Sequence, residues 1–401
     1  MASTPTRTGP LAGLKVLDLT RILAGPSATQ LFGDMGADVV KVERPGRGDD
    51  TRAWGPPFVM DADGNPTSES GYYLSANRNK RSLAIDITAP EGIETLHRMV
   101  AKADILIENF KKDGLAKYKL DYATLAQINP GLIYCSITGF GQTGPNAHRA
   151  GYDIMVQGYG GIMSITGPEG GEPYKVGVAI CDLMTGMYAT TAILAALNHR
   201  HASGKGQHID LSLVDTQVAW LANQGANYLL SGTPPRAMGN AHPNIVPYQV
   251  FATAGSHIII AVGNDTQFAA FAEVLGLGHL AQDDRFATNT SRLSNRDLIV
   301  PQLAEVIATW DRDDLLAECE KRGIPAGPVH SIDEVFATDQ VKARDMVVSM
   351  DYPLSGKGKV DLIGNPIKFS ETPVDYHLPP PRCGEHTDEI LSDWLGETDE
   401  T

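Results

Sequence analysis

The sequence predicts an α/β protein with a Rossmann-like large domain, built on a mostly parallel sheet, and a smaller α+β domain. Two observations support this prediction. Short apolar stretches alternate with stretches of helical length through the first half of the chain. From about residue 225 the pattern changes to a loop rich in proline, glycine and asparagine. The expected parts are residues 1–224, residues 225–345 and a tail of residues 346–401 that returns to the large domain.

The large domain is expected to begin with a β-α-β unit, in which "LKVLDLT" and "ADVVKVE" are strands and "AGPSATQLFGDMG" is a helix. Further strands are expected at "RSLAIDI", "DILIENF", "LIYCSITGFG" and "HIDLSLVDT", and helices at "APEGIETLHRMVAKA" and "YATLAQINP". Parallel sheets bind ligands at the carboxyl ends of their strands, where the loops "TRILAGP", "ERPGRGD", "ENF" and "TGFG" should converge. Glu43 stands where a Rossmann protein carries its ribose-binding acid, but "TRILAGP" is not GxGxxG, which argues against a nicotinamide cofactor.

The small domain is expected to contain a β-hairpin and several helices. "QVFATAGSHIIIAVG" predicts two strands around the turn "TAGS", and "DTQFAAFAEVLG" and "RDLIVPQLAEVIATW" predict helices. In the tail, a proline-rich entry leads to a C-terminal helix at "EHTDEILSDWLG".

The composition excludes several classes of function. A net charge of −15 over 401 residues argues against a nucleic-acid partner, although a local basic pocket could still bind a small anion. The N-terminus lacks the apolar region of a signal peptide, and no segment is predicted to cross a membrane, so we expect a cytoplasmic protein. No metal site is expected, because the chain has no HExxH motif and no Cys/His cluster.

The cysteines predict no disulfides. They lie in or beside apolar runs without paired spacing, which is typical of reduced, buried thiols: Cys135, Cys181, Cys319 and Cys383.

Asp182 has two interpretations from pattern alone. It precedes a long, mostly apolar helical stretch, so it can be the N-cap of a buried helix, which is worth about 1 kcal/mol. A carboxylate mounted there could also act as a nucleophile on an activated acyl group.

Basic residues gather in the loops at the expected sheet edge, which fits a phosphate-bearing ligand as well as scattered solvated charge: Arg21, Arg44, Arg47, Arg52, Arg78, Lys80 and Arg81.

A set of motifs occurs in an order that resembles the family III CoA-transferases (the formyl-CoA transferase and carnitine CoA-transferase family): "PLAGLKVLDLTRILAGP", "GADVVKVERPGRGDDTR", "ANRNKRSLAIDI", "LIENF", "ITGFGQTGP", "VAICDLMTGMYA", "SGKGQHIDLSL", "GIPAGPV" and "GEHTDEIL". The resemblance implies ring-shaped protomers interlocked in a homodimer, with Asp182 as the nucleophile. It also implies that CoA moves between carboxylic acids through aspartyl anhydride and aspartyl-CoA thioester intermediates. CoA is then a substrate and product, and no tightly bound cofactor or metal is needed.

By matched position, the resemblance implies residues that contact CoA: Ile22, Leu23, Ala24, Arg44, Lys80, Asn109, Phe110, Lys117, Thr138 and Phe140. It also implies residues of the acceptor site and of an active-site lid at 239–244: Tyr152, Gly239, Asn240 and His242. Formyl-CoA:oxalate transferases carry a glutamine at the position of Leu23 and a lysine at that of Thr138, and glycines where this chain has "AHPNIVPY". The pattern is more similar to the branch that uses succinyl-CoA and a dicarboxylic acid such as glutarate.

Two other functions stay open. An α-methylacyl-CoA racemase would need a histidine where this chain has Tyr152, and tyrosine is a poor proton shuttle near neutral pH. A non-catalytic CoA-binding protein would use Asp182 only as a cap. The cation for an acceptor's second carboxylate also stays open among five residues: Arg21, Arg52, Arg78, Arg236 and His242.

Overall fold

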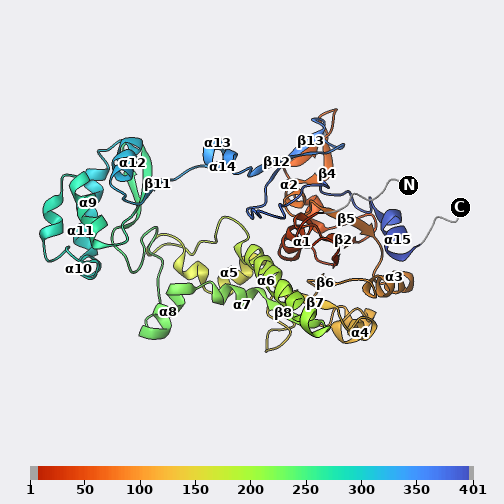
Figure 1. Ribbon diagram of the computed structural model, residues 1–401. Coiled ribbons are helices and arrows are strands. Elements are labelled where there is room, and N and C mark those ends of the chain that lie inside the picture. Colours follow the sequence, from red (N-terminus) through yellow and green to blue (C-terminus); the bar gives the residue numbers. More distant parts are fainter. Residues whose placement is uncertain (1–7, 397–401) are drawn as a thin grey trace. The chain divides into compact units, whose positions relative to one another are not determined.

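The computed structural model describes residues 8–396, which form two compact units (Figure 1). The first unit comprises the chain up to Ile162, Lys175–Leu230 and the chain from Gln340 onward. The second comprises Met163–Tyr174 and Ser231–Asp339. Each unit has its own hydrophobic core.

The strands of the first unit are β1 (Lys15–Asp18), β2 (Asp38–Glu43), β3 (Phe58–Met60), β4 (Pro66–Ser70), β5 (Lys80–Ala84), β6 (Ile105–Glu108), β7 (Ile133–Thr138), β8 (Gln207–Ser212), β12 (Val347–Asp351) and β13 (Lys359–Ile363). Its helices are α1 (Ala24–Asp34), α2 (Gly71–Leu74), α3 (Pro90–Val100), α4 (Tyr122–Ile128), α5 (Asp153–Tyr159), α6 (Ile180–Ser203), α7 (Leu213–Ala219), α8 (Ala222–Ser231), α14 (Asp339–Ala343) and α15 (Thr387–Leu395).

Six parallel strands form the central sheet, in the order β5-β2-β1-β6-β7-β8. Taken in chain order these strands are 3-2-1-4-5-6, the order of a Rossmann-type sheet, which reverses between β1 and β6. The predicted Rossmann-like fold is therefore confirmed. The point of reversal is where such sheets bind their ligands.

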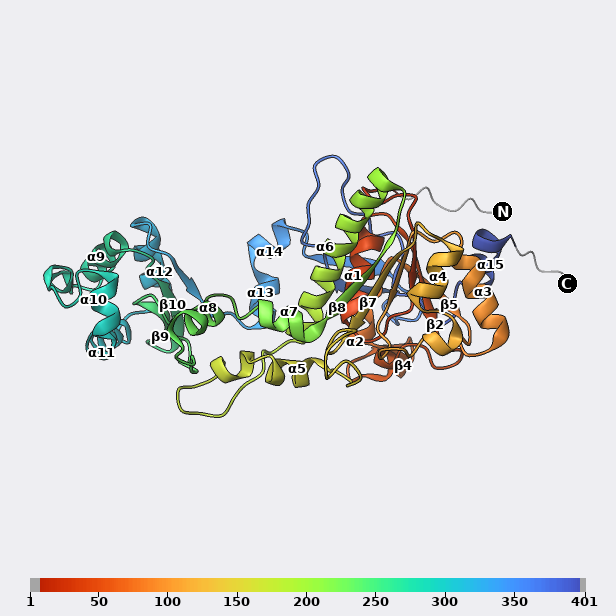
Figure 2. The same cartoon turned by 90° about the horizontal axis from the view of Figure 1, so that it is seen from below.

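Helices cover both faces of this sheet, with α1 and α6 on one side and α3, α4 and α15 on the other (Figure 2). Alternate residues of β1 show how the sequence produces these layers. Val16 packs with Phe32 of α1 and Ile193 of α6, and the next residue, Leu17, packs on the opposite face with Trp394 of α15. Both faces are buried, so each strand reads as a nearly continuous apolar run.

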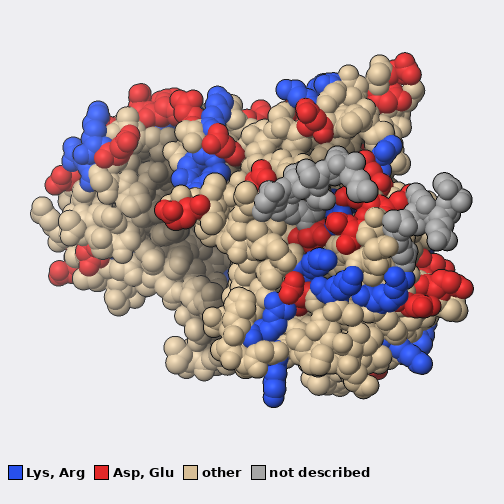
Figure 3. Space-filling model, turned by 45° about the vertical axis from the view of Figure 1, so that its right-hand side comes forward, with Lys and Arg blue, Asp and Glu red and all other residues tan. Residues whose placement is uncertain are grey.

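Helix α6 is the one helix among residues 8–396 that could cross a membrane by length and composition. Half of its most apolar window is buried inside the protein, and core helices meet the same criterion. On the face drawn in Figure 3, Lys and Arg side chains form small groups that are separated by Asp and Glu.

The second unit contains an antiparallel sheet, β11-β10-β9, built from β9 (Tyr248–Thr253), β10 (Ser256–Ala261) and β11 (Ala326–Pro328). The predicted hairpin is confirmed: β9 and β10 pair around Ala254 and Gly255, and Gly255 supplies the positive φ of 88° that the turn requires. Its helices are α9 (Asp265–Val274), α10 (Asn289–Ser294), α11 (Arg296–Ile307), α12 (Arg312–Lys321) and α13 (Ile332–Ala337).

Two further hairpins in the first unit, β3–β4 and β12–β13, were not expected from the sequence. Their strands have only three to five residues, which is too short for a period-2 pattern to stand out from the flanking loops.

Helices α1 and α6 approach each other closely at Gly186. A Cβ atom at this position would lie 2.3 Å from the Ser27 hydroxyl and 2.7 Å from the Ala24 carbonyl oxygen. The contact matters for the site because α1 follows directly on the "TRILAGP" loop and α6 carries Asp182.

We predict that Gly186→Ala destabilises the protein, although alanine normally favours a helix interior by about 1 kcal/mol over glycine. The added methyl group must push α1 and α6 apart at a cost of about 1–3 kcal/mol. Urea unfolding measures the change, with Gly71→Ala as control, because a Cβ there would lie 3.4 Å from the Pro57 ring, an ordinary contact. Equal midpoints for Gly186→Ala and the unsubstituted protein would contradict this packing.

Candidate active site

A cavity of about 540 Å³ opens in the first unit at the carboxyl edge of the central sheet. Its lining comes from the loops after β1, β2, β5, β6 and β7, from Arg149–Tyr152 and from Asp182. The loops after β1, β2, β6 and β7 are those that the sequence predicted to converge, and the loop after β5 joins them. The cavity therefore lies at the reversal of strand order between β1 and β6.

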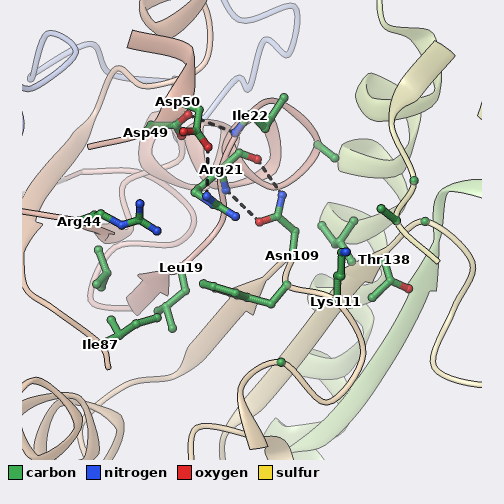
Figure 4. A pocket seen from close by; sticks show the side chains of 18 of the residues that line it. Leu19, Arg21, Ile22, Arg44, Asp49, Asp50, Ile87, Asn109, Lys111 and Thr138 are labelled. Carbon is green, nitrogen blue, oxygen red and sulfur yellow. Dashed lines mark hydrogen bonds and ion pairs between the residues drawn. The ribbon is translucent and has the colours of Figure 1, made fainter. Parts of the chain in front are cut away.

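The lining includes basic side chains that, among residues 8–396, form no ion pair with a carboxylate: Arg44, Lys111, Lys112, Lys117 and Arg149. In Figure 4, Arg44 and Lys111 lie on different loops at the cavity wall. Positive charge that is not used in ion pairs suits a ligand that carries several phosphate charges.

Most of the site residues that the sequence singled out line this cavity: Ile22, Leu23, Ala24, Arg44, Asn109, Phe110, Lys117, Thr138, Tyr152 and Asp182.

Two of the expected CoA contacts lie elsewhere. Lys80 has no exposed surface, and its ammonium group donates to the Asp18 carboxylate at 3.2 Å, to the Pro26 carbonyl at 2.9 Å and to the Asn77 side chain at 2.9 Å. All three of its N–H bonds are used inside the protein, so it has none left for a phosphate. Phe140 packs edge-on against Tyr159 and does not line the cavity.

The expected lid residues Gly239, Asn240 and His242 belong to the second unit. Their loop is tied down there: the Gly239 N–H donates to the Gly167 carbonyl at 2.9 Å, and the Arg296 guanidinium donates to the His242 carbonyl at 2.7 Å. Their role as a lid stays a prediction.

Much of the basic cluster is committed to internal ion pairs. Arg52 is buried and bonds Glu43 and Glu69, with N–O distances of 2.7 and 2.6 Å. Arg78 pairs with Asp34 at 2.6 Å. Arg52 and Arg78 are therefore unavailable to an acceptor's carboxylate. Because Arg52 occupies the Glu43 carboxylate, that residue is also not free to bind a ribose.

Asp182 is not the N-cap of its helix, contrary to one interpretation of the sequence. Helix α6 begins at Ile180, so Asp182 lies in the first turn as its third residue. The cap comes from another helix: Asp153, the first residue of α5, accepts the backbone N–H groups of Cys181 at 2.8 Å and Asp182 at 3.3 Å. Capping by Asp153 leaves the carboxylate of Asp182 free to face the cavity.

The surroundings of Asp182 disfavour its charged form. Its side chain is 8% exposed and accepts no hydrogen bond from the described part of the chain. Burial, followed by the nearby negative charge of Asp153, raises the pKa of Asp182 to about 7. Burial also raises the pKa of Tyr72 to about 12, and the charges of Asp182 and Asp153 add to this rise. Strongly perturbed acids in a cavity are typical of catalytic sites.

Cys181, next to Asp182, is a packing residue, as predicted. Its thiol is buried and donates to the Gln217 side chain at 2.8 Å, and burial raises its pKa to about 12. Of the other cysteines, Cys135 and Cys319 are buried and Cys383 is partly exposed, and all four are free.

No group of three or more His, Cys, Asp or Glu side chains within residues 8–396 is arranged to hold a metal ion.

Comparison with known proteins identifies the family. Residues 11–387 match the model of CoA-transferase family III. The chain is 51% identical to a succinate–glutarate CoA-transferase of Agrobacterium fabrum over 393 residues, 98% of either chain. This chain belongs to CoA-transferase family III. It is also 43% identical to a human succinyl-CoA:glutarate CoA-transferase, over 96% of this chain and 86% of that one. A crystal structure of a CaiB/BaiF family protein from Brucella suis matches with a TM-score of 0.84 at 50% identity, covering 97% of this chain and 100% of that chain.

The family resemblance inferred from the sequence motifs is thus confirmed, and the chain is an enzyme that transfers CoA. Sequence reasoning missed Asp153, which stands beside Tyr152 in the segment "AGYDIMVQ". An acidic residue at the start of a short helix usually caps that helix, and nothing in the sequence indicates that Asp153 caps a helix 28 residues further along instead.

We predict that Asp182→Asn stabilises the folded protein in a pH-dependent way. The pKa of Asp182 is about 7 in the folded state against 3.8 for an ordinary aspartate, so between these pH values the folded state binds the extra proton. As pH rises, the unsubstituted protein therefore loses stability relative to the variant. The difference between their free energies of unfolding levels off above about pH 7, at up to about 4 kcal/mol. Urea unfolding at several pH values measures it. A difference that does not change between about pH 5 and pH 8 would sink this account.

Asp153→Asn should lower the pKa of Asp182, because the neighbouring negative charge is removed while the amide oxygen can still cap α6. Asp153→Ala should lower this pKa as well and should also cost about 1 kcal/mol of stability, because the cap is lost. The measurement is the pH at which the effect of Asp182→Asn levels off in each Asp153 background. No shift of that pH in either background would show that burial alone sets the pKa of Asp182.

Proposed function

We propose that this enzyme transfers CoA from succinyl-CoA to a dicarboxylic acid, with glutarate as the first acceptor to test, through covalent intermediates on Asp182. The observation that carries the proposal is the environment of Asp182. Among residues 8–396 it is a buried carboxylate that accepts no hydrogen bond, in a cavity whose lining includes cations that form no ion pair. The names of the relatives from Agrobacterium fabrum and human support the choice of substrates.

The first half of the reaction releases the donor acid. A carboxylate oxygen of Asp182 attacks the thioester carbonyl of succinyl-CoA, the C–S bond breaks, and a mixed anhydride and CoA thiolate form. The thiolate then attacks the aspartyl carbonyl carbon. The anhydride C–O bond breaks, succinate leaves, and Asp182 carries CoA as a thioester.

The second half repeats these steps in reverse on the acceptor. A carboxylate of the acceptor attacks the aspartyl thioester, which gives a second anhydride and the thiolate. The thiolate attacks the acceptor's carbonyl carbon, and the acceptor's CoA thioester leaves with Asp182 restored. Each step conserves an activated acyl bond, so the cycle needs no ATP.

This chemistry fits the surroundings of Asp182. A carboxylate with a raised pKa is more basic, and hence more nucleophilic, than an ordinary aspartate, and at about pH 7 about half of it is charged. An exposed fraction of 8% also limits the access of water, which would hydrolyse an anhydride.

We propose that the cavity cations bind the phosphates of CoA and that Arg21 binds the acceptor's second carboxylate. Arg21 is the candidate of the first unit that is not buried in an ion pair: its guanidinium contacts Asp50 at 3.0 Å, and its side chain is 42% exposed. Its Nε atom is a buried donor that has no partner within residues 8–396. The acceptor's carboxylate would supply that partner.

The interlocked homodimer and the lid at 239–244 remain part of this proposal. Several apolar side chains of the first unit lie exposed on α5 and α8, and another copy of the chain could cover them: Ile154 (53%), Tyr159 (56%), Leu229 (83%) and Leu230 (89%).

The test is a CoA-exchange assay read by mass spectrometry, with succinyl-CoA offered against glutarate, oxalate, mesaconate, citramalate, malate and acetate. We expect glutaryl-CoA to form, and we expect Asp182→Ala to abolish it. Enzyme incubated with succinyl-CoA alone should carry the mass of CoA less one water on the peptide that contains Asp182.

Other outcomes separate the alternatives. Exchange with oxalate and not with glutarate would move the enzyme to the oxalate branch. Deuterium uptake at Cα of a 2-methylacyl-CoA, without exchange, would indicate a racemase. CoA binding without any reaction would leave a binding protein.

A further inference from the structure

Ile22 adopts an unusual backbone conformation in the loop between β1 and α1. Its φ angle is 75°, in the left-handed region that β-branched residues rarely occupy. Such a conformation persists only where the surrounding structure enforces it, and it is often found in active sites. Ile22 lines the cavity that contains Asp182.

The residues around Ile22 are held by side chains from other parts of the chain (Figure 4). Asn109 makes two bonds to the backbone of Arg21: its Oδ1 accepts the N–H at 3.0 Å, and its Nδ2 donates to the carbonyl at 2.7 Å. Asp49 accepts the N–H of Ile22 at 3.3 Å, and Asp50 holds the Arg21 side chain. We call Asn109 and Asp49 the loop clamp.

The clamp is itself fixed by buried charge. Asp49 pairs with Lys41 at 2.8 Å, and neither side chain is exposed. The same ammonium group donates to the carbonyl of Thr20 at 2.9 Å, while the Thr20 N–H is bonded to the carboxylate of Asp18. Successive backbone groups from Thr20 to Ile22 are therefore each tied to a side chain, which leaves this loop little freedom.

The position of the clamp in the sheet explains why Asn109 can reach the loop. β1 and β6 are neighbours with Asp18 opposite Ile107, so Thr20 and Asn109 leave the sheet at the same level. This is the reversal point of the strand order, where the connections after neighbouring strands run to opposite sides of the sheet. Asn109 joins the loop after β6 to the loop after β1.

We propose that Asn109 and Asp49 are positioning residues that hold Ile22 in its left-handed conformation and so fix the cavity wall for the reaction at Asp182. Asn109 acts in this way through the backbone of Arg21. Its Oδ1 atom and one of its two amide hydrogens are already used there, so this side chain shapes the cavity wall.

Hydrogen exchange tests the clamp without reference to catalysis. In the unsubstituted protein the amides of Arg21 and Ile22 should exchange slowly. In Asn109→Ala, exchange in the peptide that contains 20–24 should become at least about tenfold faster, because the loop opens without its partner. Unchanged exchange would overturn the proposal, whatever the activity of the enzyme.

A second experiment rests on the proposed function and measures transfer from succinyl-CoA. Asn109→Ala should lower kcat by about 10- to 100-fold, because small displacements of a reactive geometry are costly, and should change the dissociation constant of free CoA by less than about threefold. Ile22→Gly and Ile22→Ala both remove the side chain, but only glycine accepts a positive φ without strain. In the Ile22→Gly background, Asn109→Ala should therefore cost about tenfold less in kcat than in the Ile22→Ala background.

Two results would make Asn109 a direct CoA contact and overturn the proposal. One is an equal loss of kcat on Asn109→Ala in the two Ile22 backgrounds, and the other is an equal rise of the CoA dissociation constant in both. Should Asn109→Ala fail to fold, Asn109→Asp replaces it. It keeps the acceptor for the Arg21 N–H and loses the donor to the Arg21 carbonyl, so hydrogen exchange at 20–24 should still become faster and decides the clamp. If the enzyme transfers no CoA at all, the proposed function fails, and hydrogen exchange still decides the clamp.

Discussion

Two ion pairs without solvent exposure anchor the loops that form the cavity. Lys41 pairs with Asp49 at 2.8 Å and Lys80 with Asp18 at 3.2 Å. Burying an ion costs several kcal/mol unless its partner and further hydrogen bonds compensate. Here they do, because Lys41 also donates to the Thr20 carbonyl and Lys80 to the Pro26 carbonyl. The loops after β1 and β2 therefore cannot shift without leaving a buried charge unpaired, and this constraint defines the cavity wall.

The cavity treats its carboxylates in two opposite ways. Asp49 is buried, but its cationic partner Lys41 and the N–H and hydroxyl of Thr51 lower its pKa to about 2, so it remains a fixed charge. Asp182 is buried without such partners and stands near Asp153, so its pKa rises to about 7. A pair of carboxylates with pKa values driven apart is a common mark of divided roles, one structural and one reactive. In this site Asp49 holds the loop through the N–H of Ile22, and Asp182, the residue proposed as the nucleophile, faces the cavity.

The sequence predicted the architecture well because the central strands are buried on both faces. Segments such as "LKVLDLT" and "LIYCSIT" have no solvent face that would interrupt their apolar runs, and the glycine that ends "QLFGDMG" marks the helix end. The convergence of loops at the carboxyl edge followed from topology alone. The local sequence pattern was misleading where the role of a residue depends on a distant partner. A lysine such as Lys80 can bind phosphate, and only the packed structure reveals that it pairs with Asp18 instead.

The same reason explains why the sequence did not reveal the cap by Asp153 or the bonds from Asn109 to Arg21. Asp153 and Asn109 act on backbone groups 28 and 88 residues away, and sequence periodicity carries no information about contacts at that distance. One signal was nonetheless present. Lys41 interrupts the buried strand "DVVKVE", and a lysine in such a strand must find a buried carboxylate, because an unpaired ammonium group there would be too costly. A charge inside an apolar strand thus predicts a buried partner of opposite charge, and in this enzyme that partner, Asp49, also accepts the N–H of Ile22.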